Sequence, residues 1–162
     1  MVRPSNESDI EAISAIYAHY VRHSTATFET EPPDPIEMGR RRANIQLCNL
    51  PYIVAEANGL VVGYAYATPY RPRNAYRFTV EDSIYIHPEH LGKGVGKALL
   101  ASLIDACKHG GARQMIAIIG GSDNAASIRL HESFKFNHAG TLKSVEFKFE
   151  QWLDTVLMQR AL

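Results

Sequence analysis

The stretch that decides the fold is His90–Leu100, which reads HLGKGVGKALL and follows the β-rich run Asp82–His87. This order predicts a strand, then a glycine loop, then the start of a helix. The first backbone N–H groups of a helix have no partner within it, and the positive end of the helix dipole lies beside them. Three alternate glycines let the backbone approach an anion closely, and two lysines add positive charge. The pattern predicts an anion site, and a diphosphate fits it best.

The spacing of the glycines disfavours two familiar phosphate loops. A P-loop requires G-x-x-x-x-G-K-[ST], whereas Gly92 and Gly96 stand one residue too close and Ala98 replaces the metal-binding hydroxyl. A dinucleotide fingerprint requires G-x-G-x-x-G near the start of a βαβ unit, whereas this loop is G-x-G-x-G and lies past the middle of the chain. ATP hydrolysis and NAD binding are therefore disfavoured. A plain strand-to-helix turn is the alternative interpretation of the loop.

Composition sets the class of protein. The 162 residues are 46% hydrophobic, which suits a single domain over 1–162. Lys plus Arg equals Asp plus Glu at 17 each, so the chain lacks the charge of a nucleic-acid or anionic-membrane partner. Cys48 and Cys107 form neither a disulfide framework nor a zinc pair, which fits a reducing cytoplasm. No run approaches the roughly 20 apolar residues that span a bilayer, so we expect a soluble cytoplasmic protein.

Hydrophobic periodicity and turn signals predict an α/β fold. The run Arg40–Arg42 is predicted to be the solvated face of the second helix. The expected elements are a helix from the capping box Ser8–Glu11, a loop over 24–33, a helix from Asp34 to about Cys48, strands 52–56 and 60–68 joined by Asn58-Gly59, a strand 78–87, a helix from the glycine loop to Gly110-Gly111, a strand 115–119, a helix 124–133, and strands 136–149 and 152–159. They predict a mixed, mostly antiparallel sheet with helices on both faces.

Leu91–Gly96 resembles the pyrophosphate loop, [Q/R]-x-x-G-x-[G/A], of the GCN5-related N-acetyltransferases, and the element order matches that fold along nearly the whole chain. Asn124–Phe136 resembles the superfamily segment N-x-x-[AS]-x-x-[LM]-[YH]-x-x-x-G-[FY]. Two positions depart from these patterns. Leu91 replaces Gln or Arg, so we expect acetyl-CoA binding to be weakened but retained, because main-chain N–H groups hold most of the diphosphate. Lys135 replaces a glycine that commonly takes a positive φ, so either Lys135 accepts strain or the turn differs.

Within the superfamily, the chain is most similar to the phosphinothricin and methionine sulfoximine N-acetyltransferases. The segments that carry this resemblance are 24–32 (STATFETEP), 71–76 (RPRNAY), 79–86 (TVEDSIYI), 118–120 (IIG) and 152–154 (WLD). The resemblance implies an enzyme that transfers acetyl from acetyl-CoA directly to the α-amino group of a small amino-acid analogue. It also implies a homodimer, which the large apolar residues Phe147, Phe149, Trp152 and Leu157 of the last two strands would suit.

The resemblance also assigns residues to the site. Cofactor contacts fall on Ile84, Tyr85, Ile86, Leu91, Gly92, Lys93, Gly94, Val95, Gly96, Asn124 and Ser133. Substrate contacts fall on Phe28, Glu29, Arg71, Pro72, Arg73, Glu81, Asp82 and Ser83. For Asn124, an ordinary helix N-cap is the alternative. Arg71 and Arg73 suit an anionic or dipolar side chain, with an exposed basic loop as the alternative.

The chemistry of acetyl transfer needs a base and an acid. An amine attacks a thioester only when unprotonated, and Glu81 is the predicted base, with a solvent-facing carboxylate as the alternative. Asp82 lies on the opposite face of the expected strand, so both carboxylates should reach one site only if a bulge intervenes. Backbone N–H groups over 84–86 would stabilise the oxyanion. His131 is the predicted proton donor to the CoA thiolate, with a packed helix histidine as the alternative.

Other readings remain open. The acceptor could be a polyamine, a peptide N-terminus or another amine, or the chain could be a non-catalytic acyl-CoA sensor. Cys107 falls on the apolar face of its expected helix, which makes it a poor nucleophile and favours direct transfer. His87 and His90 lack further ligands at zinc spacing, so we expect no metal.

Overall fold

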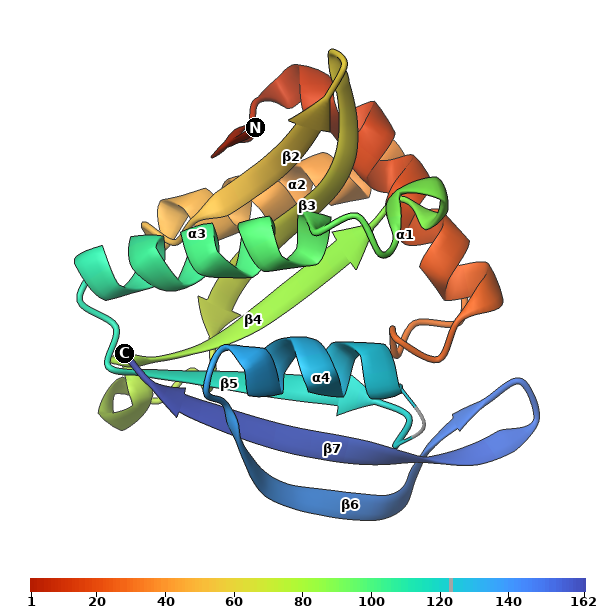
Figure 1. Cartoon of the computed structure of the whole chain (residues 1–162), viewed down its shortest axis with the longest axis vertical. Helices are drawn as coiled ribbons and strands as arrows, with labels where there is room; N and C mark the ends of the chain where they lie inside the picture. Colours follow the sequence, from red (N-terminus) through yellow and green to blue (C-terminus); the bar gives the residue numbers. More distant parts are fainter. Residues whose placement is uncertain (123) are drawn as a thin grey trace.

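The structure is a computed structural model that describes residues 1–122 and 124–162. In this part of the chain, seven strands form one sheet in the order β1-β2-β3-β4-β5-β7-β6 (Figure 1). The strands are β1 (Val2–Pro4), β2 (Tyr52–Ala57), β3 (Leu60–Pro69), β4 (Thr79–Ile86), β5 (Gln114–Gly120), β6 (Asn137–Lys148) and β7 (Gln151–Ala161). The helices are α1 (Ile10–His23), α2 (Pro35–Leu47), α3 (Val95–His109) and α4 (Ala125–Ser133), with short 3₁₀ turns at Glu7–Asp9, Asn74–Tyr76 and Pro88–His90.

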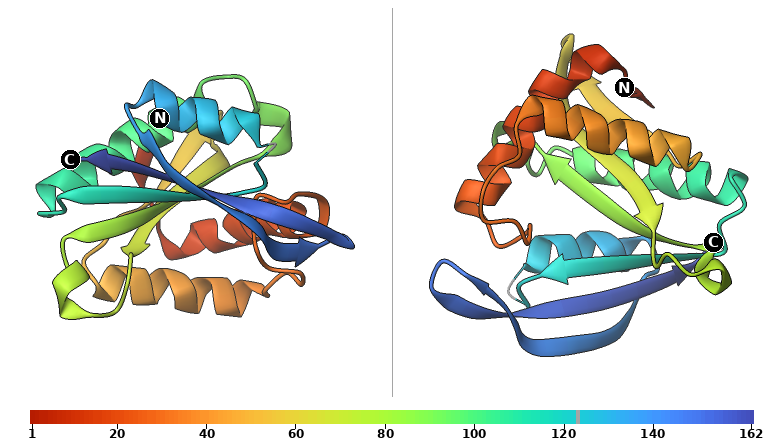
Figure 2. Two further views of the ribbon diagram at one scale, coloured as in Figure 1. Left: turned by 90° about the horizontal axis from the view of Figure 1, so that it is seen from below. Right: turned by 180° about the vertical axis from the view of Figure 1, so that it is seen from behind.

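The sheet separates two layers of helices (Figure 2). Helices α1 and α2 pack on one face, around a cluster that includes Ile13 and Tyr64. Helix α3 packs on the other face, where Leu99 and Leu103 meet Met115, and α4 lies on the same side. Both clusters are apolar side chains removed from water, which supplies the main driving force for folding. The predicted mixed sheet with helices on both faces is confirmed.

Helix starts follow local capping chemistry, with one correction. Asp34 caps α2 as predicted, because its side chain accepts from the Glu37 N–H at 2.8 Å. The predicted capping box at Ser8–Glu11 is wrong. Asn6 instead accepts from the Ser8 N–H at 2.9 Å, and Asp9 accepts from the Asn6 N–H at 2.8 Å. The chain therefore enters the 3₁₀ turn two residues earlier and continues into α1.

The three arginines of α2 do not share one solvated face. Arg40 is exposed and pairs with Glu37, but Arg42 is buried and donates to the Ser5 side chain and carbonyl, both at 2.7 Å. Arg41 is half-buried and reaches Glu29. The prediction of a solvated run therefore holds for Arg40 alone. Burial of the other two depends on partners that are distant in sequence.

The sheet opens between its two central strands. Parallel pairing of β4 with β5 joins only Thr79–Asp82 to Gln114–Ala117. Beyond that point β4 continues beside β3 as far as Ile86, while β5 continues beside β7 as far as Gly120. The two strands part visibly in Figure 1. The opening places the end of each strand at the border of a space between the two halves of the sheet.

Lys135 follows α4 with a φ of +63°, so the lysine accepts the left-handed conformation that is expected of a glycine at this position in the sequence pattern. A left-handed residue costs about 1–2 kcal/mol for a non-glycine side chain, and glycine loses about 0.5–1 kcal/mol in chain entropy. We expect Lys135→Gly to stabilise the protein by up to about 1 kcal/mol, which raises Tm by ~2–4 °C. The matched control is Lys108→Gly near the end of α3, which should lower Tm. A Tm that falls in both variants would show that the left-handed backbone at Lys135 does not destabilise the protein.

Candidate active site

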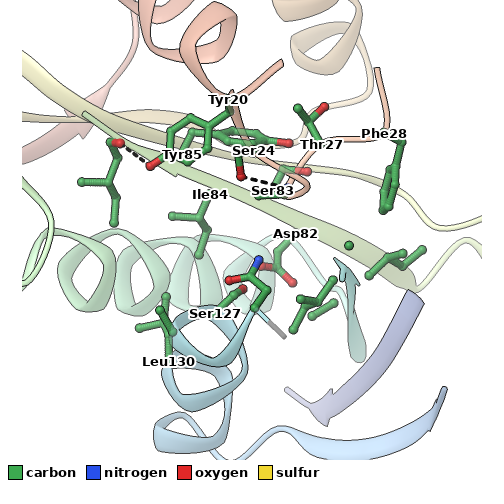
Figure 3. A pocket seen from close by; sticks show the side chains of 18 of the residues that line it. Tyr20, Ser24, Thr27, Phe28, Asp82, Ser83, Ile84, Tyr85, Ser127 and Leu130 are labelled. Atoms are coloured by element: carbon green, nitrogen blue, oxygen red, sulfur yellow. Dashed lines mark hydrogen bonds between the residues drawn. The ribbon is translucent and has the colours of Figure 1, made fainter. Parts of the chain in front are cut away.

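A cavity of about 430 Å³ occupies the opening between β4 and β5. Its walls come from α1, the loop after α1, β4, β5 and α4 (Figure 3). Among the predicted site residues, those that line it are Phe28, Glu29, Glu81, Asp82, Ser83, Ile84, Tyr85, Ile86, Leu91, Asn124 and His131. Residues that the sequence analysis did not single out also line it, among them Tyr17, Tyr20, Tyr66 and Ser127. The cavity thus joins both predicted halves of the site.

Glu81 and Asp82 line this one cavity without a bulge. The β3–β4 register runs unbroken from Gly63 opposite Ile86 to Pro69 opposite Val80. The two carboxylates do alternate: Asp82 contacts His131 on the α4 side, whereas Glu81 lies near Tyr66 on the other face. Because the strands part after Asp82, the cavity reaches both faces of the sheet. The expectation that alternation would separate the two carboxylates is therefore wrong.

The surroundings of the Glu81 carboxyl raise its pKa. Burial raises its pKa, the charge of Asp82 raises it further, and the charge of Arg71 offsets part of the effect. Desolvation disfavours the charged form of a carboxylate, and a nearby like charge acts in the same direction. A carboxylate with a raised pKa accepts a proton more readily than an exposed one, which is the property that a general base requires.

His131 is 3% exposed and makes two polar contacts. Its Nδ1 lies 2.7 Å from the Ser127 carbonyl oxygen, and its Nε2 lies 2.9 Å from Asp82 Oδ2. The Phe136 ring packs edge-on against the imidazole, with 4.9 Å between ring centroids. Burial lowers the pKa of His131, but the hydrogen bond and charge of Asp82, with the Ser127 carbonyl, outweigh it and leave this pKa above its ordinary value.

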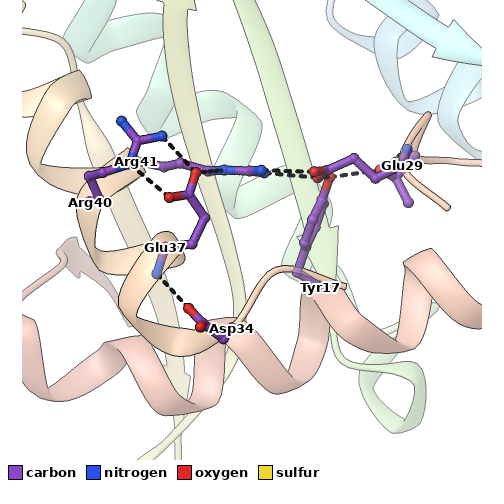
Figure 4. A network of polar contacts seen from close by, with 7 residues as sticks. Tyr17, Glu29, Asp34, Glu37, Arg40 and Arg41 are labelled. Carbon is purple, nitrogen blue, oxygen red and sulfur yellow. Dashed lines mark hydrogen bonds and ion pairs between the residues drawn. The ribbon is translucent and has the colours of Figure 1, made fainter. Parts of the chain in front are cut away.

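The loop between α1 and α2 supplies one wall and is tied down from two sides. On one side, Tyr17 and Arg41 bind the Glu29 carboxylate, and Arg41 makes two contacts with it at 2.8 Å (Figure 4). On the other side, the Lys148 ammonium of β6 donates to the carbonyls of Ser24 and Thr27 at 2.7 and 2.9 Å. These contacts fix a segment that has no regular backbone ladder of its own.

The glycine loop has the backbone geometry of an anion site. Gly92 and Gly94 have φ values of +72° and +81°, which a side chain would strain. The first backbone hydrogen bond of α3 runs from Ala98 N–H to Gly94 O at 3.1 Å, so the three preceding N–H groups have no acceptor within the helix. A Cβ on Gly96 would lie 3.0 Å from Ile86 Cδ1, so the third glycine lets the loop pack against β4 and α4. Lys93 and Val95 lie within this segment.

Nine predicted residues do not line the cavity, namely Gly92–Gly96 of the glycine loop, Arg71, Pro72, Arg73 and Ser133. Arg71, Pro72 and Arg73 line a separate groove with Asn74 and Arg77. The Arg71 guanidinium stacks on the Tyr70 ring, 4.2 Å from its centroid, yet its charge still acts on Glu81. Ser133 ends α4 and donates to the Leu130 carbonyl at 2.6 Å. Asn124 does line the cavity, and its side chain makes no capping bond to the described residues of α4.

Comparison with known proteins agrees with this geometry. Residues 13–136 match the acetyltransferase (GNAT) family, and the chain belongs to that family. It is 56% identical over 161 residues to a phosphinothricin N-acetyltransferase of Alcaligenes faecalis, covering 99% of this chain and 82% of the relative. It is 40% identical to an L-methionine sulfoximine/L-methionine sulfone acetyltransferase of Salmonella typhimurium, covering 99% and 94%.

A solved structure matches equally well. The GNAT superfamily phosphinothricin acetyltransferase from Sinorhizobium meliloti, determined in complex with AcCoA, superposes with a TM-score of 0.98 at 47% identity. The match covers 100% of this chain and 88% of that one. The resemblance to the phosphinothricin and methionine sulfoximine acetyltransferases is confirmed. Within the described residues, no helix is long and apolar enough to cross a membrane.

Proposed function

We propose that this chain, acting as a single domain over 1–162, transfers the acetyl group of acetyl-CoA to the α-amino group of a small amino-acid analogue such as phosphinothricin or methionine sulfoximine. The observation that carries the proposal is one cavity that runs from Leu91 at the glycine loop to Glu81 through the opening in the sheet. The identities of 56% and 40% to enzymes named for these substrates support the acceptor class. Acetyl-CoA supplies the activated acyl group.

The residues divide the reaction between them. Glu81 takes a proton from the amine, directly or through water, so that the nitrogen can attack. The neutral nitrogen then adds to the thioester carbon and gives an oxyanion. The carbon–sulfur bond breaks as the carbonyl re-forms, and the surplus proton of the nitrogen passes to the departing CoA thiolate. The edge of β4 over Ile84–Ile86 is no longer paired with β5, so it offers main-chain N–H groups to the oxyanion. Burial raises the pKa of Cys107 to about 12, which leaves direct transfer as the chemistry.

The other proposed contacts divide into a cofactor end and an acceptor end of the cavity. On the cofactor side, Gly92–Gly96 would bind the diphosphate and Asn124 the pantetheine portion. On the acceptor side, Phe28, Glu29 and Ser83 line the space next to Glu81. The guanidinium groups of Arg71 and Arg73, beside Pro72, would meet an anionic acceptor side chain from the neighbouring groove. Ser133, at the far end of α4, remains a proposed cofactor contact on resemblance alone.

A thiol-release assay tests the function. Acetyl-CoA is supplied with L-phosphinothricin, L-methionine sulfoximine, L-methionine sulfone, spermidine or a peptide amine in separate reactions. Release selective for the first three is the expected result. Thiol release with spermidine or the peptide amine would show that the acceptor is a polyamine or a peptide instead of an amino-acid analogue. Tight CoA binding without acetylation of any amine would identify an acyl-CoA sensor instead.

Leu91 offers a gain-of-affinity test. It is 55% exposed and lines the cavity beside the glycine loop, at the position where the family's loop pattern has Gln or Arg. A guanidinium there would add a charge-assisted contact to the diphosphate. We expect Leu91→Arg to lower the Kd for acetyl-CoA by roughly five-fold, about 1 kcal/mol. Calorimetry at two salt concentrations measures it, and a gain that persists undiminished at high salt would contradict an ionic origin.

We further propose a homodimer in the cytoplasm. Phe147, Phe149 and Trp152 are 57%, 48% and 67% exposed on the β6–β7 hairpin, and partly buried Leu157 lies on the same strand pair. A second copy is the partner we assign to this apolar surface. Cys48 and Cys107 are free thiols, in keeping with a reducing compartment. Sedimentation that detects only an 18.0 kDa species at micromolar concentration would contradict the dimer.

A further inference from the structure

Where β4 and β5 part, Asp82 and His131 form a buried pair. Their side chains are 2% and 4% exposed, and His131 Nε2 lies 2.9 Å from Asp82 Oδ2. His131 Nδ1 lies 2.7 Å from the carbonyl oxygen of Ser127. Because a carbonyl oxygen only accepts hydrogen bonds, Nδ1 must carry a hydrogen.

This tautomer fixes the number of protons in the pair. If Nε2 also carries a hydrogen, the ring is an imidazolium that donates to the Asp82 carboxylate. If Nε2 has a lone pair, it is held at 2.9 Å only when Oδ2 carries the hydrogen. Both arrangements place one proton between Nε2 and Oδ2. The raised pKa of His131, caused by the hydrogen bond and charge of Asp82 against the opposing effect of burial, favours the imidazolium with the carboxylate.

The hydrogen-bond acceptor that this pair leaves unused belongs to Asp82. Both nitrogens of His131 are occupied, so neither is free to give a proton to a leaving thiolate. Asp82 Oδ1, in contrast, is buried and has no hydrogen-bond partner among the described residues. Asp82 and Ser127 face the same space from β4 and α4 (Figure 3). A carboxylate oxygen in this position carries a desolvation cost that a ligand N–H would remove.

The surrounding groups indicate what ligand this oxygen suits. From α3, Cys107 faces Asp82 as a neutral thiol, because burial and the charge of Asp82 raise its pKa to about 12. From α4, Ser127 contributes a carbonyl that His131 already occupies. On β4 itself, Glu81 adds a second carboxylate to the cavity wall. Two carboxylates around one small space attract an ammonium or amine N–H, and the reacting group of the proposed acceptor is of this kind.

We propose that Asp82 Oδ1 accepts a hydrogen bond from the acceptor amine, and that His131 is a positioning residue that holds Asp82 for this contact through their shared proton. The inference rests on the proposed function and deepens it. His131 then acts through Asp82 instead of protonating the thiolate. No bond is made or broken by the pair, because its proton stays between Nε2 and Oδ2 while Glu81 takes the proton of the amine.

Three substitutions test the arrangement in the intact protein. His131→Phe keeps an aromatic ring but removes the donor to Asp82, and His131→Gln restores an N–H donor that is not an acid. We expect the KM for L-methionine sulfoximine to rise at least tenfold in His131→Phe and to return to within about threefold of wild type in His131→Gln, with the KM for acetyl-CoA unchanged. Asp82→Ala should raise the same KM at least tenfold, whereas Asp105→Ala on the exposed face of α3 should not.

A loss of kcat shared by His131→Phe and His131→Gln, with unchanged acceptor KM, would restore His131 as the acid and overturn the inference. Nitrogen-15 NMR of wild type gives a second, activity-independent readout. Nδ1 should be protonated throughout pH 6–8, and Nε2 should lose its hydrogen at neutral pH in Asp82→Ala. A wild-type ring with its lone pair on Nδ1 would refute the pair.

Turnover by wild type tests the proposed function by itself. If wild type acetylates the sulfoximine while the variants behave alike, only the inference fails. If wild type acetylates nothing, calorimetry with L-methionine sulfoximine in the presence of CoA still decides the inference. Weaker binding to Asp82→Ala than to wild type supports it, and equal binding overturns it.

Discussion

Glu81→Gln is expected to lower kcat at saturating acetyl-CoA by about 100-fold or more, the usual contribution of a general base. The amide keeps the size of the side chain but cannot take a proton from the amine. The Kd for acetyl-CoA should stay within about twofold, because an amide of the same size replaces Glu81 on the acceptor side of the cavity. The matched control is Glu11→Gln on the exposed face of α1, which should leave kcat unchanged.

The pH profile gives the same residue a second test. A base works only when deprotonated, so kcat/KM should rise with pH through the pKa of Glu81. Burial and the charge of Asp82 raise that pKa, so the acidic limb should lie above the range of an exposed carboxylate. Glu81→Gln should remove this limb. A variant that keeps both the wild-type rate and the wild-type limb would exclude Glu81 from proton transfer.

Lys148→Met is expected to destabilise the fold and impair acceptor binding together. The Lys148 residue is 5% exposed, and its ammonium donates to two carbonyls of the loop after α1. Methionine keeps much of the length but leaves both carbonyls without this donor, at a cost of about 2–4 kcal/mol in the free energy of unfolding. Tm should fall by roughly 6–12 °C. The KM for the acceptor should rise about tenfold, because this loop carries Phe28 and Glu29 into the cavity.

Lys143→Met is the control on the same strand. Its side chain is 75% exposed and pairs with Asp154 at the surface, so Tm should fall by no more than about 2 °C. Calorimetric melting and steady-state kinetics on both variants separate stability from binding. A lower Tm for Lys148→Met with an unchanged acceptor KM would mean that the loop keeps its cavity-lining shape without this anchor.

The sequence predicted the parts of the molecule that local chemistry controls. Asp34 caps α2 because its carboxylate needs only an N–H three residues away, and Asn58-Gly59 closes the β2–β3 hairpin by itself. The glycine loop followed from spacing for the same reason. Local patterns can still mislead. Ser8–Glu11 matches the capping-box pattern, but Asn6 and Asp9 form the capping hydrogen bonds.

Contacts between distant segments were beyond the reach of local patterns. The Lys148 ammonium donates a hydrogen bond to the Ser24 carbonyl, and the two residues are 124 positions apart in the sequence. Hydrophobic periodicity cannot predict a contact between such distant residues. The sequence predicts a solvated Arg41 because it shows the charge of this residue but not its pairing with Glu29. The shared cavity of Glu81 and Asp82 depends on where two strands stop pairing. The pairing of Asp82 with His131 joins β4 to α4 across 49 positions.

The brief parallel contact of β4 with β5 has a consequence for how the protein opens. Among the described residues, the strand ladder between the amino-terminal half-sheet and the half formed by β5, β7 and β6 consists of Thr79–Asp82 paired with Gln114–Ala117. Such a seam lets the two halves exchange amide hydrogens as separate cooperative units. A molecule lodged in the opening touches both halves, so its binding energy opposes their separation. Saturating ligand should therefore slow hydrogen exchange in β5 and β7 as strongly as in β4, and make the sheet unfold as one unit.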